Sequence, residues 1–212
     1  NEVLDQPNSI HNAPEKDQEK ISINQPASLE FKNVDFRFHG AERLALHDLN
    51  FKVTAGQTLA IIGGTGSGKS ALVNLIPRLF DIESGEIKVD GVPVKKLSQH
   101  NLHEVISITQ QQAVLFSGTI RSNLQFGYEE ATDKEMWYAL EIAQAADFVR
   151  EEGGLDAVVE QNGSNFSGGQ RQRLAIARTI IKPASIYVFD DSFSALDFET
   201  DAKLRAALAK DP

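Results

Sequence analysis

A glycine-rich segment between an apolar stretch and a helix-like stretch most constrains how this chain can fold. Residues 63–70 have the sequence Gly-Gly-Thr-Gly-Ser-Gly-Lys-Ser, which matches the pattern G-x-x-x-x-G-K-[ST]. Residues 58–62 before it are mostly apolar, as in a short strand. Apolar residues after it recur at helical spacing, at Leu72, Leu75, Ile76 and Leu79. This order of strand, loop and helix predicts a phosphate-binding (Walker A) loop in an α/β domain.

The composition of the loop explains the chemistry expected of it. Its glycines allow the backbone N–H groups to turn inward, and the dipole of the following helix favours a bound anion. We expect Lys69 to reach the phosphate oxygens of ATP and the Ser70 hydroxyl to ligate Mg²⁺. A chance glycine turn is the alternative, but the strand and helix on either side argue against it. The predicted nucleotide contacts here are Gly63, Gly64, Thr65, Gly66, Ser67, Gly68, Lys69, Ser70 and Ala71.

The remaining periodicity predicts a mixed α/β fold. Strands are expected at about 29–38, 49–53, 87–89, 105–108 and 185–189, the first with a slip at residues 32–33. Helices are expected at 132–150, 168–181 and 199–209, with Thr132 as an N-cap and Glu135 as its capping-box partner. The fold class is therefore a phosphate-loop NTPase core, a mostly parallel sheet flanked by helices. An antiparallel β subdomain comes first, and a helical subdomain spans about 116–181.

Composition narrows the classes of function. The formal net charge is −9, which lacks the overall basic character of a nucleic-acid binder, so we expect no nucleic-acid partner. There is no cysteine, which excludes disulfides and thiolate metal sites. No apolar run approaches the roughly 18 residues of a membrane span. Residues 1–27 are polar and are expected to be a linker or a docking tail. Because the chain starts at Asn1 rather than Met, we expect a fragment of a longer protein.

Two adjacent carboxylates follow the predicted strand at 185–189. Asp190 is placed where an acid at a strand end holds Mg²⁺ through water, although an Asp that ends a strand in a turn is also common. Asp191 comes next, at the place of a general base for the attacking water. Its side chain is one methylene shorter than that of Glu, about 1.5 Å. Slow hydrolysis of ATP at this site is therefore expected.

A second glycine-rich helix start carries the resemblance to a known family. Residues 165–170 have the sequence Asn-Phe-Ser-Gly-Gly-Gln. Together with the loop and Asp190, the segment resembles the LSGGQ signature of ABC transporter nucleotide-binding domains, with Phe166 in place of Leu. The resemblance covers residues 29–209. It implies that Ser167, Gly168, Gly169 and Gln170 close over the γ-phosphate held by a second nucleotide-binding domain, and that the helical subdomain carries the signature.

Three more positions match the family residue by residue. Gln111 resembles the Q-loop glutamine, which would touch Mg²⁺ and the attacking water, although Gln110 and Gln112 leave the register open. Asp197 resembles the D-loop aspartate, which crosses the interface between two such domains. Phe38 stands where an aromatic residue stacks on adenine, and a core residue of the first strand is the alternative.

Other segments resemble exporters that carry a membrane domain on the same polypeptide. Residues 114–127 do so, as do residues 1–5, which are similar to the end of a half-transporter membrane domain. The resemblance implies a linker at 1–27, an ABC ATP-binding domain at 28–212 and a place at the cytoplasmic face of the cell membrane. All five histidines precede the D-loop segment, so the family's switch histidine is missing, and we expect a C-terminal truncation.

Asp191 departs from the family pattern, because active members carry Glu there. The resemblance then implies the degenerate-site subunit of a heterodimeric, bacterial multidrug-type exporter. A soluble ABC ATPase of DNA repair or translation is an alternative. However, the interval before the signature is too short for the repair-type coiled coil, and only one cassette is present. A regulatory module that binds ATP without turnover is another. The transported substrate is not readable from these residues.

Overall fold

The computed structural model describes residues 10–23 and 25–210. The chain divides into two compact units, Asn1–Ile106 and Ser107–Pro212. Residues 1–5, which resemble the end of a half-transporter membrane domain, lie outside the described residues. Within the described part, none of the helices combines the length and apolar character of a membrane span.

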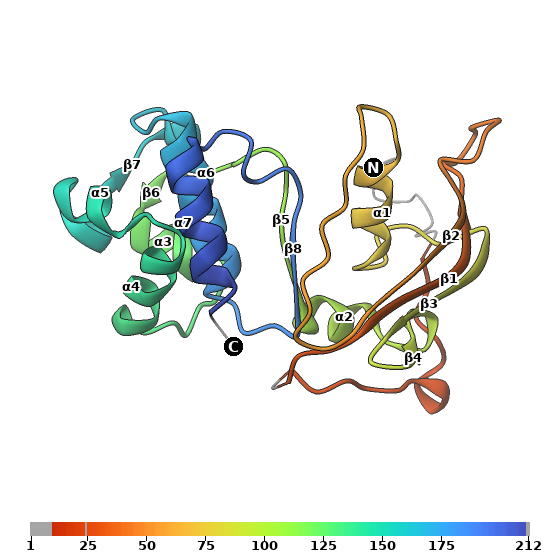
Figure 1. Ribbon diagram of the computed structural model, residues 1–212. Coiled ribbons are helices and arrows are strands. Elements are labelled where there is room, and N and C mark those ends of the chain that lie inside the picture. Colours follow the sequence, from red (N-terminus) through yellow and green to blue (C-terminus); the bar gives the residue numbers. More distant parts are fainter. Residues whose placement is uncertain (1–9, 24, 211–212) are drawn as a thin grey trace, which may run out of the picture. The chain divides into compact units, whose positions relative to one another are not determined.

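The first unit is built on a four-stranded sheet with the order β2-β1-β3-β4 (Figure 1). The strands are β1 (Leu29–Phe36), β2 (Leu46–Val53), β3 (Ser84–Val89) and β4 (Val92–Pro93), and all pairs are antiparallel. The predicted slip in β1 is confirmed. The register shifts on both sides of the strand near Asn33, which has a positive φ of 48°. This bulge keeps Phe31 and Val34 buried on either side of it.

Short helices complete the first unit. They are α1 (Lys69–Leu75), α2 (Gln99–Val105), η1 (Glu15–Asp17) and η2 (Val94–Lys96). The sequence did not predict α2, whose N-cap Ser98 accepts a hydrogen bond from the backbone of Asn101.

The predicted strand at residues 58–62 is wrong, because these residues have no strand conformation. None of the strands in the described part of the first unit pairs with them, so they lack the ladder hydrogen bonds that define a strand. Their apolar side chains are exposed to solvent, and Ile62 is 94% exposed. The periodicity identified an apolar segment correctly but could not supply its partner strand.

The described part of the predicted N-terminal linker packs against the first unit. Ile10 and Ile21 are buried. The side chain of Asn101 bonds the backbone of Ile21 twice, accepting from its N–H at 2.9 Å and donating to its carbonyl at 3.1 Å. Glu19 pairs with Leu97 in an isolated parallel bridge. Residues of this segment therefore share the core of the first unit.

The second unit is mostly helical. Helix α6 (Gly168–Ile180) packs against α3 (Ile120–Gln125) and α4 (Asp133–Ile142), and α4 also packs against α7 (Phe198–Leu208) (Figure 1). The shorter elements are α5 (Ala146–Glu151), η3 (Gly154–Asp156) and η4 (Gln161–Gly163). Two small sheets pair β5 (Ile106–Thr109) with β8 (Ile186–Phe189), and β6 (Gly118–Thr119) with β7 (Val158–Val159).

One apolar core holds the second unit together, and its fully buried members include Leu115, Met136, Leu140, Ile176 and Leu204. The predicted helix at 132–150 is divided into α4 and α5, because Gln144 adopts a positive φ of 57° between them. The capping box of Thr132 and Glu135 is confirmed. The mixed α/β class, with an antiparallel subdomain first and helices after it, is confirmed as well.

Candidate nucleotide site

The phosphate loop closes around the amino group of its own lysine. Lys69 Nζ donates to the carbonyl of Gly63, to the carbonyl of Gly64 at 2.9 Å and to Ser67 Oγ at 3.5 Å. A turn within the loop joins Ser67 N to the Gly64 carbonyl at 3.2 Å. The cation therefore lies inside the loop, where phosphate oxygens could replace the carbonyls as its partners.

Glycine is required at two of the loop positions. Gly66 and Gly68 have positive φ values of 80° and 90°, which side chains rarely adopt. A Cβ on Gly68 would also lie 2.7 Å from the carbonyl oxygen of Ala45. At Gly64, by contrast, an added Cβ would meet nothing within 4 Å. The loop thus rests on the chain before β2 at one glycine and keeps open space at another, as a cradle for a ligand requires.

The rest of the loop differs in exposure. Residues 63–67 and Ser70 are exposed, so the Ser70 hydroxyl can meet a ligand. Ala71 is only 3% exposed and packs into the core, which leaves its backbone as the part that could contact a phosphate.

Phe38 is linked to the same loop through the chain that connects β1 to β2. The Ala45 on which Gly68 rests donates its N–H to the carbonyl of Phe36 at 2.8 Å. Phe38 follows two residues later and is 43% exposed. It is therefore not the core residue of β1 that the alternative interpretation required; that place is taken by Phe36.

In the second unit, two predicted catalytic residues meet. Gln111 Nε2 donates a hydrogen bond to Asp191 Oδ2 at 3.1 Å. The backbone N–H of Asp190 donates to the Thr109 carbonyl at 3.0 Å, which aligns the ends of β8 and β5. Asp191 itself has a positive φ of 47°. The strand ends thus bring both carboxylates and Gln111 into one neighbourhood of the second unit.

The signature segment forms the start of α6 through a capping box. Ser167 Oγ accepts from Gln170 N at 3.2 Å, and Gln170 Oε1 accepts from Ser167 N at 2.8 Å. Gly168 is open, because an added Cβ would meet nothing within 4 Å, whereas at Gly169 it would lie 3.2 Å from the Ala195 carbonyl. Phe166 is buried in the core of the unit, which explains an apolar residue there.

Asp197 begins the next helix. Its carboxylate accepts from Thr200 N at 2.9 Å and from Thr200 Oγ1 at 2.7 Å, as the N-cap of α7. The N–H of Thr200 holds the pKa of Asp197 below its ordinary value, and the hydroxyl of Thr200 adds to this. Asp197 thus has a structural role as a helix cap within the second unit. Its predicted role at the interface with a second domain is a separate proposal.

The sequence analysis assigned no role to two arginines of α6, Arg173 and Arg178. Their side chains hold neighbouring segments of the second unit against this helix. Arg178 donates to the Val114 carbonyl at 2.9 Å and lies over the ring of Phe116. Arg173 donates to the Gln144 carbonyl at 2.7 Å. Burial lowers the pKa of both guanidinium groups. The signal that could have found them is a charged residue repeated among the apolar positions of this helix.

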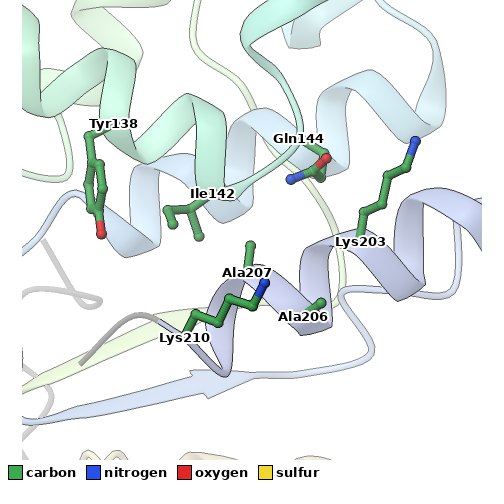
Figure 2. Close-up of a pocket in the computed structure, with 7 residues that line it drawn as sticks. All are labelled: Tyr138, Ile142, Gln144, Lys203, Ala206, Ala207 and Lys210. Atoms are coloured by element: carbon green, nitrogen blue, oxygen red, sulfur yellow. The ribbon is translucent and has the colours of Figure 1, made fainter.

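A hollow of the second unit lies away from the predicted site residues. It has a volume of about 430 Å³ and lies between α4 and α7, where Figure 2 shows side chains from both helices. Its lining residues are Tyr138, Ile142, Gln144, Lys203, Ala206, Ala207 and Lys210. No predicted nucleotide contact lines it. Among the described residues no three His, Cys, Asp or Glu side chains form a metal cage either. A metal ion at the nucleotide site would therefore need ligands other than a cluster of such side chains. Mg²⁺ meets this condition, because it is commonly bound by one or two carboxylates, water and the phosphates of a nucleotide.

A phosphate loop at the start of a helix, with a carboxylate at a strand end and a helical lobe that carries a glycine-rich helix start, defines a nucleotide-binding ATPase class. The family model described as ABC transporter matches residues 46–194. This chain belongs to the ABC transporter family.

Similar proteins agree with the assignment. An uncharacterized ABC transporter ATP-binding protein of Mycobacterium tuberculosis is 49% identical over 82% of this chain and 30% of its own length. The ATP-dependent lipid A-core flippase of Albidiferax ferrireducens is 41% identical over 84% of this chain and 31% of its own. A beta-(1→2)glucan export ATP-binding/permease protein of Rhizobium johnstonii is 44% identical over 85% and 31%.

Among solved structures, a bacterial Atm1-family ABC exporter with ATP bound has a TM-score of 0.89 and 35% identity. That similarity covers 98% of this chain and 36% of the exporter. The chain thus spans about a third of the length of the proteins it matches. The fold class expected from the sequence, a phosphate-loop NTPase domain with an antiparallel β subdomain, is confirmed.

Proposed function

We propose that this chain is the ATP-binding and ATP-hydrolysing domain of an exporter, and that it dimerises around ATP and Mg²⁺ to power substrate export. The observation that carries the proposal is the loop closed around Lys69 Nζ, with open space at Gly64. The similarity to a flippase, a glucan export protein and an Atm1-family exporter supports the direction of transport. They do not favour the soluble ATPase of DNA repair or translation.

The loop residues fit a nucleoside triphosphate. In this proposal, backbone N–H groups of residues 63–71 bind the phosphates, and Lys69 exchanges its loop carbonyls for phosphate oxygens. Phe38 presents its exposed ring to adenine. Binding then depends on the Lys69 cation, which already lies inside the loop before the exchange.

The side chains proposed as Mg²⁺ ligands carry the oxygen donors that this metal prefers. Ser70, Asp190 and Gln111 would hold it, directly or through water, and the metal would neutralise charge on the phosphates. Gln111 and Asp191 also orient the attacking water, and Asp191 accepts its proton. Because Asp191 has the shorter side chain, we propose that this site hydrolyses ATP weakly and holds it longer. The same feature keeps a regulatory, non-hydrolysing module as the second candidate.

Each nucleotide site is completed by a second nucleotide-binding domain. Ser167, Gly168, Gly169 and Gln170 of this chain would close over ATP held by the partner, with Asp197 beside that interface. A heterodimer partner with Glu at the position of Asp191 fits the weakened site. The membrane domain would be part of the same polypeptide, joined through residues 1–27 to the domain at 28–212 (its helical subdomain about 116–181). In this proposal the domain lies at the cytoplasmic face of the cell membrane.

The test is ATP binding and phosphate release, measured separately on the chain and on the longer protein beside its partner. Lys69→Ala is expected to weaken ATP binding by at least about tenfold, because it removes a charge-assisted contact to phosphate. Lys95→Ala, an exposed lysine outside the loop, is the matched control and should bind ATP normally. Retention of full ATP affinity by Lys69→Ala would contradict the proposal.

A further inference from the structure

A second exposed phenylalanine stands beside Phe38. Phe80 is 40% exposed, and its ring centroid lies 5.6 Å from that of Phe38 with an interplanar angle of 84°. Phe36, fully buried, lies 4.8 Å from Phe38 at 78° and 5.7 Å from Phe80. The three rings form an aromatic cluster in which neither neighbour lies flat on Phe38. Such perpendicular contacts are favourable and fix the tilt of a ring.

The segment that carries Phe80 is fastened to the end of β1 by two contacts of Glu83. Glu83 N donates to the Asp35 carbonyl at 2.9 Å, and Arg37 Nε pairs with the Glu83 carboxylate at 2.9 Å. Arg37 directly precedes Phe38, so this ion pair joins the two aromatic segments next to the rings. The contact between Phe38 and Phe80 is therefore built by the backbone and by charge, and is not a chance approach of two loose side chains.

The other end of the segment is fixed as well. Arg78 has a positive φ of 54° and is 5% exposed. Its Nε pairs with Asp81 Oδ1 at 2.8 Å, three residues further along the chain. Phe80 lies between these two partners in the sequence. A buried arginine with a fixed backbone thus sets the direction in which the turn presents Phe80.

Both rings of the pair are partly exposed. Phe80 and Phe38 remain 40% and 43% exposed, so a part of each ring stays accessible to a ligand. The phosphate loop rests on the same connection, through Gly68 against Ala45 and Ala45 against Phe36. Of the two exposed rings, Phe38 therefore lies in the connection that supports the loop, and Phe80 contacts it from the segment after α1.

We infer that Phe80 is a positioning residue for the nucleotide base: its ring holds Phe38 at the tilt needed to stack on adenine. The inference rests on the proposed function, in which Phe38 stacks on the base. It predicts that Phe80 contributes to affinity for the base and not for the phosphates. Because it acts through Phe38, its effect should vanish when Phe38 is absent.

The experiment compares the affinities of the 212-residue chain for Mg-ATP and for inorganic tripolyphosphate, which has no base, by calorimetry. Phe80→Ala is expected to weaken ATP binding about three- to tenfold, the worth of an aromatic pair, and to leave tripolyphosphate binding unchanged. Phe80→Tyr keeps the ring and should restore ATP binding. Leu79→Ala, a neighbour with 42% exposure outside the cluster, is the matched control and should change neither affinity.

A double-mutant cycle separates positioning from direct contact. In a Phe38→Ala background, Phe80→Ala should cause no further change in the ratio of the two affinities. Full additivity, an unchanged ratio in Phe80→Ala, or equal loss of both ligands would each overturn the inference. Failure of the proposed function gives a different result, namely Lys69→Ala that still binds both ligands normally.

Discussion

Gln111 and Asp191, 80 residues apart in the sequence, are joined by a hydrogen bond of 3.1 Å from the glutamine amide to Asp191 Oδ2. The bond ties the segment after β5 to the end of β8. It favours Gln111 over its two glutamine neighbours as the residue that works beside the carboxylates. It also occupies one oxygen of the carboxylate proposed as the general base, which leaves the other for water.

Asp191→Glu is expected to raise ATP hydrolysis, by up to about 10²-fold, because the added methylene carries the carboxylate toward the attacking water. The measurement is phosphate release by the longer protein beside its partner, at saturating ATP. Asp191→Asn is the control: it keeps the length of Asp191 but cannot accept a proton, so it should release no more phosphate than the unmodified protein. An equal rate for Asp191 and Glu would show that carboxylate reach does not limit hydrolysis.

Gly68→Ala should destabilise the chain by about 1–3 kcal/mol, because Ala is strained at a φ of 90° and its Cβ would press on the Ala45 carbonyl. Denaturant unfolding measures this. Gly64→Ala is the matched control from the same loop, since an added Cβ there meets nothing within 4 Å. We expect its stability to change by no more than about 0.5 kcal/mol. Equal losses for the two variants would mean that the approach of Gly68 to Ala45 does not limit stability.

Local signals in the sequence predicted the local structure well. The bulge in β1, the capping box at Thr132 and the helix from Gly168 all depend on neighbours within a few residues, and all are confirmed. The helix break at Gln144 was missed, because a single residue in the left-handed region leaves no mark on apolar periodicity.

Relationships between distant segments were the part that the sequence could not supply. Residues 58–62 are apolar enough for a strand. A strand also needs a partner strand, however, and the periodicity of a segment does not identify its partner. The bond between Gln111 and Asp191 joins segments 80 residues apart, and the cluster of Phe38 with Phe80 joins two exposed rings. The exposure of an aromatic side chain is likewise determined by the fold and cannot be predicted from the residue type alone.

Arg121 should give the second unit part of its stability above acidic pH. Its guanidinium pairs with Asp156 at 2.8 Å and with Asp133, and it holds the pKa of Asp156 below its ordinary value. Since the folded-state pKa is lowered, this stabilisation is present above the ordinary pKa and is lost as the pH falls through the folded value. Arg121→Met should therefore lower stability at neutral pH and flatten its decline between about pH 5 and pH 2.

The check on Arg121 is the urea midpoint measured across that pH range. Arg150→Met is the matched control, because Arg150 also pairs with two carboxylates, at 3.1 Å each, but is 52% exposed against 29% for Arg121. Solvent screening should make the loss in the control smaller. If both variants have the same acid profile as the unmodified chain, the pair with Asp156 contributes nothing to stability.

Ser167 caps α6 and is also proposed to contact the partner's ATP, and a comparison with the cap of α4 distinguishes these two roles. Ser167 caps α6 as Thr132 caps α4, each in a capping box, so either substitution by Ala should cost about 1 kcal/mol of unfolding free energy. Only Ser167 is proposed to close over the partner's ATP. Phosphate release by the longer protein beside its partner should therefore fall in Ser167→Ala and stay unchanged in Thr132→Ala. Equal rates in the two variants would leave Ser167 as a helix cap alone, because the shared loss of stability is already matched between them.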